Sequence, residues 1–284
     1  MKAMEQFTSG WKRNYYGKGD VTAYRLHRDG DVPDGRSPVF GANVLMLLYG
    51  DAFWPTYTTG DNSGLIATDS MKNFIQRETL DFAGFDLESY CLYLGEKFIA
   101  RYSQVEGAQV SASEVPYWGL DGSPAFVPTG PERLTARVEV DRKGLVEAVS
   151  GIRGFRLLRL GGSAFHGFVR DEYTTLPDLY DRPLHMWLDL DLHYTSPVDA
   201  FNDGNAIRRA RQVVVELFKS FESGSIQQVI YQMGTTLLGA LPQVKEVHLE
   251  AQNRTWDTAI EKDRIGVYTD ARPPYGCLGL RLRR

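Results

Sequence analysis

Cysteine is scarce in this sequence: 284 residues contain only Cys91 and Cys277, far apart and outside any metal-binding spacing. A disulfide framework is not implied, which favours a reducing compartment. Cys91 falls within an apolar helical pattern and is expected to be a core residue. The five histidines form no helical metal-binding pair, and His185 and His193 lie too far apart on one strand to bind the same ion. The sequence therefore predicts no metal site.

Long apolar runs are also absent, since none approaches the ~20 residues of a transmembrane helix. The first residues lack the apolar segment of a signal peptide, so we expect a cytoplasmic protein without a membrane partner. With 32 basic and 36 acidic side chains the net charge is −4, which argues against a nucleic-acid partner. No phosphate-binding loop, dinucleotide fingerprint or serine-nucleophile elbow occurs. Metal-dependent and covalent enzymes are therefore disfavoured.

Apolar periodicity divides the chain into two similar halves. The first half predicts strands and helices in the segments 21–28, 39–49, 68–75, 87–98 and 134–140. A long surface loop is expected over 116–131, which is rich in glycine and proline. The second half predicts strands at 145–149, 155–160, 184–192 and 247–251, and helices at 207–221 and 226–237. Strands grouped apart from helices indicate an α+β fold with antiparallel sheets, in two domains at 12–141 and 142–284.

Several polar side chains stand at the ends of these elements, and each has a simple structural interpretation. Lys18 could be a surface charge, and Asp69 could cap the helix that follows it. Arg182 could form a surface ion pair with Asp178 or Asp181, and Gln227 could solvate a helix start. Taken one at a time, these residues indicate no particular chemistry.

Taken together, five segments resemble the urate oxidase (uricase) family. They occur in the order of that family and extend from residue 15 to residue 257. They are YYGKGDV (15–21), TTGDNSGLIATDSMKN (58–73), FHGFVRDEYTTLPDLYDR (165–182), SIQ (225–227) and NRTWD (253–257). The resemblance implies tandem tunnelling-fold domains. It also implies homotetramers in which sheets join into barrels around a tunnel, with active sites at subunit interfaces.

The same resemblance implies the chemistry. Members of the family convert urate, O2 and water to 5-hydroxyisourate and hydrogen peroxide, with no metal or organic cofactor. Phe165 would stack on the flat substrate, and Arg182 would bind its anionic edge through two parallel hydrogen bonds. Gln227 would match an N–H and C=O pair on the opposite edge. The backbone N–H groups of Asp69 and Ile226 would add donors.

The resemblance also assigns catalysis. Lys18 and Thr68 match the general-base pair of the family, and Asn253 matches the residue that helps to hold O2 or water over the ring. Many members carry histidine where this chain has Thr255, and a hydroxyl cannot hold a charge near neutral pH as histidine can. The third relay position is therefore altered. The role of Arg272 is left open.

Two alternatives remain beside a urate oxidase. One is an enzyme of the pterin-handling branch of the same fold, but several members of that branch use a metal held by histidines. The other is a purine-binding protein that has lost catalysis, which the Thr255 replacement would suit.

Overall fold

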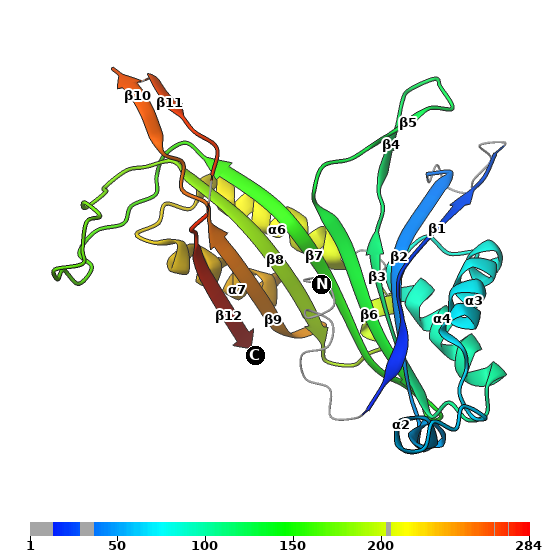
Figure 1. Cartoon of the computed structure of the whole chain (residues 1–284). Coiled ribbons are helices and arrows are strands. Elements are labelled where there is room, and N and C mark those ends of the chain that lie inside the picture. Colours follow the sequence, from blue (N-terminus) through cyan, green and yellow to red (C-terminus); the bar gives the residue numbers. More distant parts are fainter. Residues whose placement is uncertain (1–13, 29–36, 203–205, 264, 272) are drawn as a thin grey trace. The chain divides into compact units, whose positions relative to one another are not determined.

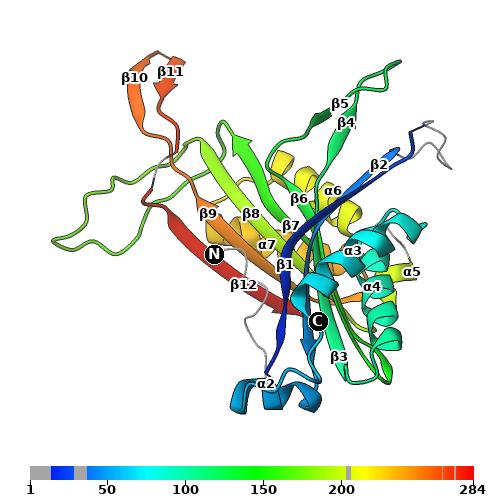
Figure 2. The same cartoon turned by 45° about the vertical axis from the view of Figure 1, so that its right-hand side comes forward.

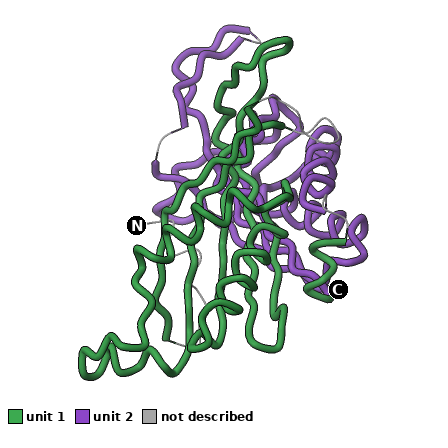
Figure 3. The backbone as a smooth tube through the Cα atoms, turned by 90° about the vertical axis from the view of Figure 1, so that its right-hand side faces the viewer, with its two compact units in different colours: residues 1–150, 196–204 green, residues 151–195, 205–284 purple. Residues whose placement is uncertain are grey.

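The computed structural model describes residues 14–28, 37–202, 206–263, 265–271 and 273–284. The chain divides into two compact units. Unit 1 comprises Met1–Ser150 and Ser196–Gly204, and unit 2 comprises Gly151–Thr195 and Asn205–Arg284 (Figure 3). Strand β7 (Gly144–Arg159) contains the point where the chain passes from one unit to the other. Domain boundaries at 12–141 and 142–284 stay predictions.

Unit 1 is an antiparallel sheet with helices on one face (Figure 1). Its strands follow the order β1-β2-β3-β6, with β7 next to β6. They are β1 (Tyr16–Leu26), β2 (Val39–Tyr49), β3 (Gly107–Glu114) and β6 (Arg133–Asp141). The helices are the 3-10 turn η2 (Asp51–Phe53), α2 (Trp54–Thr58), α3 (Thr68–Asp81), α4 (Leu87–Arg101) and α5 (Asp199–Asn202).

The apolar stripe of α4 forms much of the core of unit 1. Its buried positions include Tyr90, Cys91, Leu94 and Phe98, as the periodicity predicted. The Asp86 carboxylate caps the helix by accepting from the Ser89 N–H at 2.7 Å. The helix approaches the sheet closely, because a Cβ at Gly95 would lie 2.7 Å from a methyl group of Val140. Packing against β3 and β6 thus fixes α4 on the sheet.

Unit 2 repeats the plan. Beyond β7 the sheet continues in the order β8 (Leu184–Tyr194), β9 (Val244–Asn253) and β12 (Gly276–Arg283), with β8/β9 and β9/β12 antiparallel. Helices α6 (Ala206–Ser220) and α7 (Ile226–Ala240) cover one face of these strands (Figures 1 and 2). Burial alternates strictly along β8, so its leucines face the helices, and the alternate residues from His185 through Trp187 to His193 occupy the opposite face. The fold is therefore α+β, as predicted.

Several elements differ from the prediction. The two short strands expected at 145–149 and 155–160 are one strand, β7. The loop expected over 116–131 contains a hairpin of β4 (Tyr117–Gly119) and β5 (Phe126–Pro128). Strands β3 and β12 were missed, and so was a second hairpin, formed by β10 (Thr258–Lys262) and β11 (Ile265–Tyr268). Glycine and polar residues mark chain reversals, but they do not reveal whether the chain between them pairs.

Among the described residues, the helices are too short or too polar to cross a lipid bilayer.

Candidate functional site

The nine predicted site residues fall into two sets, one in each unit. Lys18, Thr68 and Asp69 belong to unit 1. The other six belong to unit 2: Phe165, Arg182, Ile226, Gln227, Asn253 and Thr255. Arg272 lies outside the described residues.

Lys18 stands on β1 where the strand departs from regular pairing. It lies opposite Met46 of β2, and the register shifts between Lys18 and Val21. Within this irregularity Asp20 has a φ of 58°. Such a bulge turns side chains away from the direction that regular pleating would give them. Lys18 is partly buried.

Thr68 begins α3, which packs along β1. The Tyr16 hydroxyl joins the two elements by accepting a hydrogen bond from the Ile66 backbone N–H at 3.1 Å. Lys18 and Thr68 each lie two residues further along their segments, so this bond ties together the two stretches of chain that carry the predicted catalytic pair. Phe53 packs edge-on against the Tyr16 ring at 4.8 Å between centroids and supports it.

The predicted helix cap at Asp69 is wrong. The N-cap position of α3 is Ala67, and no side chain caps it. The Asp69 carboxylate instead bonds Lys72 at 2.5 Å and Asn73 at 3.0 Å. The hydrogen bond and charge of Lys72, together with the charge of Lys18, hold the pKa of Asp69 below its usual value. The first-turn N–H groups thus remain as donors, because a helix leaves them without partners in its own backbone.

In unit 2, the backbone ties Phe165 and Arg182 to the same short segment. Phe165 exchanges two hydrogen bonds with Leu179, at 2.7 and 2.9 Å. The Arg182 N–H donates to the Ser163 carbonyl at 2.9 Å. These bonds close the two ends of a chain reversal over residues 163–182. Phe165 and Arg182, the predicted substrate-binding residues, both lie at this closed end.

The guanidinium of Arg182 lies over the Phe165 ring, with Cζ 5.6 Å from the ring centroid. Its Nε atom is buried and has no partner within the part of the chain that the structure describes. Desolvation by burial lowers the pKa of Arg182 from its ordinary value, although the group stays charged. Of the two carboxylates considered as ion-pair partners of Arg182, Asp178 pairs with Arg170 at 3.1 Å and Asp181 accepts from the Gly162 N–H at 2.6 Å. A half-buried guanidinium whose Nε lacks a partner among the described residues, beside an aromatic face, is suited to a flat anion.

The start of α7 is held against the closed end of the chain reversal that carries Phe165 and Arg182. The Ala164 N–H donates to the Ser223 carbonyl at 2.8 Å, just before the helix. Ser225 caps α7 by accepting from the Gln228 N–H at 3.2 Å. Ile226 is buried in the first turn, whereas Gln227 is exposed. The Gln227 amide and the first-turn N–H groups therefore lie at the end of the helix that is tied to the Phe165 segment.

Asn253 ends β9 between Met186 of β8 and Gly276 of β12. Because β8 begins two residues after Arg182, the end of β9 is placed close to the same part of unit 2. Thr255 follows and is exposed.

The chain leaving β9 is anchored by Arg254, which sequence reasoning missed. Its N–H donates to the His185 carbonyl at 2.9 Å, and its guanidinium bonds the Gln252 side chain at 2.9 Å. The guanidinium is also sandwiched between Trp187 and Tyr275, 4.1 and 3.7 Å from their ring centroids. The arginine beside Asn253 was visible in the sequence, but its aromatic partners come from β8 and from the residue just before β12.

None of the nine predicted residues is a histidine or a cysteine. Within the described ranges, one group of side chains could hold a metal ion: His193, Glu246 and His248. The sequence predicted no metal-binding group because that prediction relied on spacing along the chain. Spacing could not reveal this group, because its members meet across two strands. The members of the group on β9 lie five (253 − 248) and seven (253 − 246) residues from Asn253, about 17 and 23 Å at the rise of a strand.

Comparisons with known proteins agree on one family. The family model named Uricase matches residues 148–276. A uricase from Haloferax volcanii is 35% identical over 85% of this chain and 88% of its own length. The uric acid degradation bifunctional protein of Bacillus sp. TB-90 is 36% identical over 92% of this chain, but the chain spans only 58% of that relative. The crystal structure of a uricase from Bacillus fastidious superposes with a TM-score of 0.85 at 34% identity, covering 96% of this chain and 94% of the other.

Proposed function

Because this chain belongs to the uricase family and has its tunnelling fold, we propose that it is a urate oxidase. It converts urate, O2 and water to 5-hydroxyisourate and hydrogen peroxide. The observation that carries the proposal is the Arg182 guanidinium over the Phe165 ring, with a buried Nε that lacks a partner among the described residues. Urate is a flat anion, and these two side chains offer it a stacking face and a charged, directional donor.

Substrate binding then uses both units. Phe165 stacks on the urate ring, and Arg182 donates two parallel hydrogen bonds to its anionic edge. The amide of Gln227 pairs with the N–H and C=O of the opposite edge. The backbone N–H groups of Ile226 and Asp69, each in the first turn of a helix, complete the set of donors. All of these groups except the Phe165 ring recognise the edge of the molecule, which favours a planar heterocycle over an aliphatic anion.

The reaction removes two electrons from urate and reduces O2 to hydrogen peroxide, while water supplies the new hydroxyl group. Proton transfer needs a base, and we assign it to Lys18 acting through the Thr68 hydroxyl. Asn253 holds O2 or water over the ring. Thr255 stands where many relatives carry histidine, and it can relay a proton without storing a charge. Lys18 therefore bears more of the proton transfer. No cofactor is invoked, because O2 itself is the oxidant.

We further propose that the chain works as a homotetramer, with Lys18 and Thr68 facing the urate bound by a neighbouring subunit. The resemblance of both sets of residues to the uricase family supports this arrangement, and the two sets belong to different units of the chain. The cytoplasmic location remains a prediction. A test of assembly is light scattering of the purified chain, with a tetramer expected.

One assay tests the function. Chelator-treated protein is mixed with urate, and the ultraviolet absorbance of urate, O2 uptake and hydrogen peroxide are followed together. Equal amounts of urate and O2 consumed and peroxide formed are expected, without added metal. The second candidate, a non-catalytic purine binder, is favoured only by Thr255 and predicts tight urate binding without consumption. That result would overturn the proposal.

A further inference from the structure

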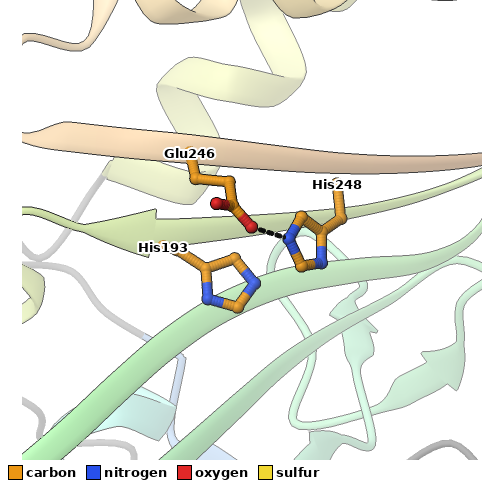
Figure 4. A group of neighbouring side chains, drawn as sticks. All are labelled: His193, Glu246 and His248. Atoms are coloured by element: carbon orange, nitrogen blue, oxygen red, sulfur yellow. Dashed lines mark hydrogen bonds and ion pairs between the residues drawn. The ribbon is translucent and has the colours of Figure 1, made fainter. Parts of the chain in front are cut away.

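The polar faces of β8 and β9 bring together His193, Glu246 and His248. One potential ligand atom from each side chain lies within 4.8 Å of the others. The imidazole rings of His193 and His248 have centroids 4.1 Å apart, and the Glu246 carboxylate contacts His248 Nε2. Figure 4 shows the carboxylate turned toward the His248 ring, with the His193 ring beside them. We propose that this group is a binding site for a late first-row divalent cation, best represented by Zn²⁺.

The donor set specifies the class of ion. Two imidazole nitrogens and one carboxylate oxygen suit Zn²⁺, Cu²⁺ or Ni²⁺ and are a poor set for Ca²⁺ or Mg²⁺, which require mainly oxygen ligands. Bonds of about 2.0–2.2 Å to a tetrahedral zinc place ligand atoms roughly 3.3 Å apart. Because these atoms already lie within 4.8 Å of one another, small side-chain rotations close the site.

Strand pairing holds the three residues in place. His193 lies directly opposite Glu246, while His248 lies opposite Asp191, two pairs further along the ladder. Glu246 and His248 are two residues apart and so share a strand face. Glu246 is only 6% exposed, and a carboxylate buried to this degree requires positive partners. Ligands on adjacent strands keep their spacing better than ligands on loops, so the site is preorganised.

Two arginines of β12 supply positive charge at Glu246. Arg283 and Arg281 lie opposite Glu246 and His248 in the β9/β12 pairing. Arg283 is ion-paired with the Glu246 carboxylate, and Arg281 lies 3.3 Å from it. Without an ion, these arginines neutralise the buried carboxylate. An ion must share or displace that charge, so the arginines weaken the site, and Arg283 competes most directly.

This site is separate from the proposed urate site, because its β9 ligands His248 and Glu246 lie about 17 and 23 Å along the strand from Asn253. It therefore serves to join β8 to β9 rather than to take part in catalysis. The inference does not rest on the proposed function, because zinc binding and urate turnover are measured independently.

The test uses the full chain, stripped with a chelator and then freed of it. Zn²⁺ is titrated in competition with a coloured chelator, and the metal retained after gel filtration is measured by mass spectrometry. About one tightly bound ion per chain is expected. His193→Gln and His248→Gln should each lose this ion, while His166→Gln, at an exposed histidine, should keep it. Co²⁺ substitution should give a visible spectrum of mixed nitrogen and oxygen ligation.

Arg283→Gln provides an opposite prediction, because it releases the Glu246 carboxylate and should tighten zinc binding. Circular dichroism of each metal-free variant establishes that the chain is folded, and the two histidine variants test the site independently. The proposal is overturned if zinc does not bind, if both histidine variants retain as much zinc as His166→Gln, or if Arg283→Gln leaves the affinity unchanged.

Discussion

The Tyr16 hydroxyl accepts a hydrogen bond from the Ile66 backbone N–H at 3.1 Å and thereby ties β1 to the start of α3. Desolvation by burial, opposed by this bond, raises the pKa of Tyr16 to about 12, so the hydroxyl is neutral at working pH. Two residues beyond each end of the bond stand Lys18 and Thr68. We therefore infer that Tyr16 positions Lys18, the proposed general base, and Thr68, its proposed relay.

Tyr16→Phe should lower kcat for urate several-fold, because Lys18 and Thr68 lose the bond that positions their segments. KM should stay nearly unchanged, because the substrate-binding side chains of unit 2 are untouched. The lost hydrogen bond should reduce the free energy of unfolding by about 1 kcal/mol. Steady-state kinetics and urea denaturation measure both effects. Tyr57→Phe is the matched control, since its hydroxyl bonds the Tyr15 carbonyl at 2.9 Å on an exposed surface. A rise in KM alone would contradict the positioning role.

Lys18→Met should reduce urate turnover by roughly 10² to 10⁴, the usual contribution of a general base. Binding of a non-reactive urate analogue, measured by calorimetry, should change much less. Lys72→Met is the control, because Lys72 forms only an exposed ion pair with Asp69, worth about 1 kcal/mol or less. Equal losses in the two variants would remove Lys18 from its assigned role.

Arg182→Lys should raise KM for urate, since lysine keeps the charge but cannot donate two parallel hydrogen bonds. A loss of about 1.5–3 kcal/mol in binding is expected, as for a hydrogen bond to a charged group. Initial rates over a range of urate concentrations measure it. Arg170→Lys, which alters an ion pair with Asp178 on an exposed segment, should leave KM near the parent value. An unchanged KM in Arg182→Lys would contradict substrate contact.

His185 should make the stability of the chain depend on pH. Its Nδ1 atom is buried without a partner among the described residues. Desolvation, opposed by Asp270 and assisted by Arg156 and Arg254, lowers the pKa of His185 below 6.5. In the unfolded chain that pKa is near 6.5, so the unfolded state binds more protons as the pH falls below that value. This contribution to stability is therefore complete above about pH 6.5 and is lost as the pH falls toward the folded-state pKa.

Urea denaturation at pH 7.5 and 5.5 measures this dependence. His185→Gln should flatten the difference between the two values, whereas His166→Gln, at an exposed histidine, should preserve it. A parent chain whose stability rises between pH 7.5 and 5.5, with the rise lost in His185→Gln, would reverse the sign and contradict the prediction.

Much of the fold was predictable from local patterns. Alternating polarity predicted β6 and β8, and helical spacing predicted α4, α6 and α7. The break predicted within β7 was wrong, because Gly151 and Gly154 lie inside a strand held by its neighbours. The cap predicted at Asp69 was wrong because Lys72 and Asn73 compete for its carboxylate. Both errors come from tertiary and side-chain contacts overriding a local preference.

Sequence alone determined the amphipathic elements, the α+β class and, through five resembling segments, the family. Those features depend on residue types and spacings along a single stretch of chain. Only the tertiary structure decided which strands are neighbours, and hence that His193 meets Glu246 and His248, that Arg254 lies between Trp187 and Tyr275, and that Tyr16 holds Ile66. The reason is physical: periodicity specifies which face of a strand is buried, whereas pairing register follows from packing between segments far apart in sequence.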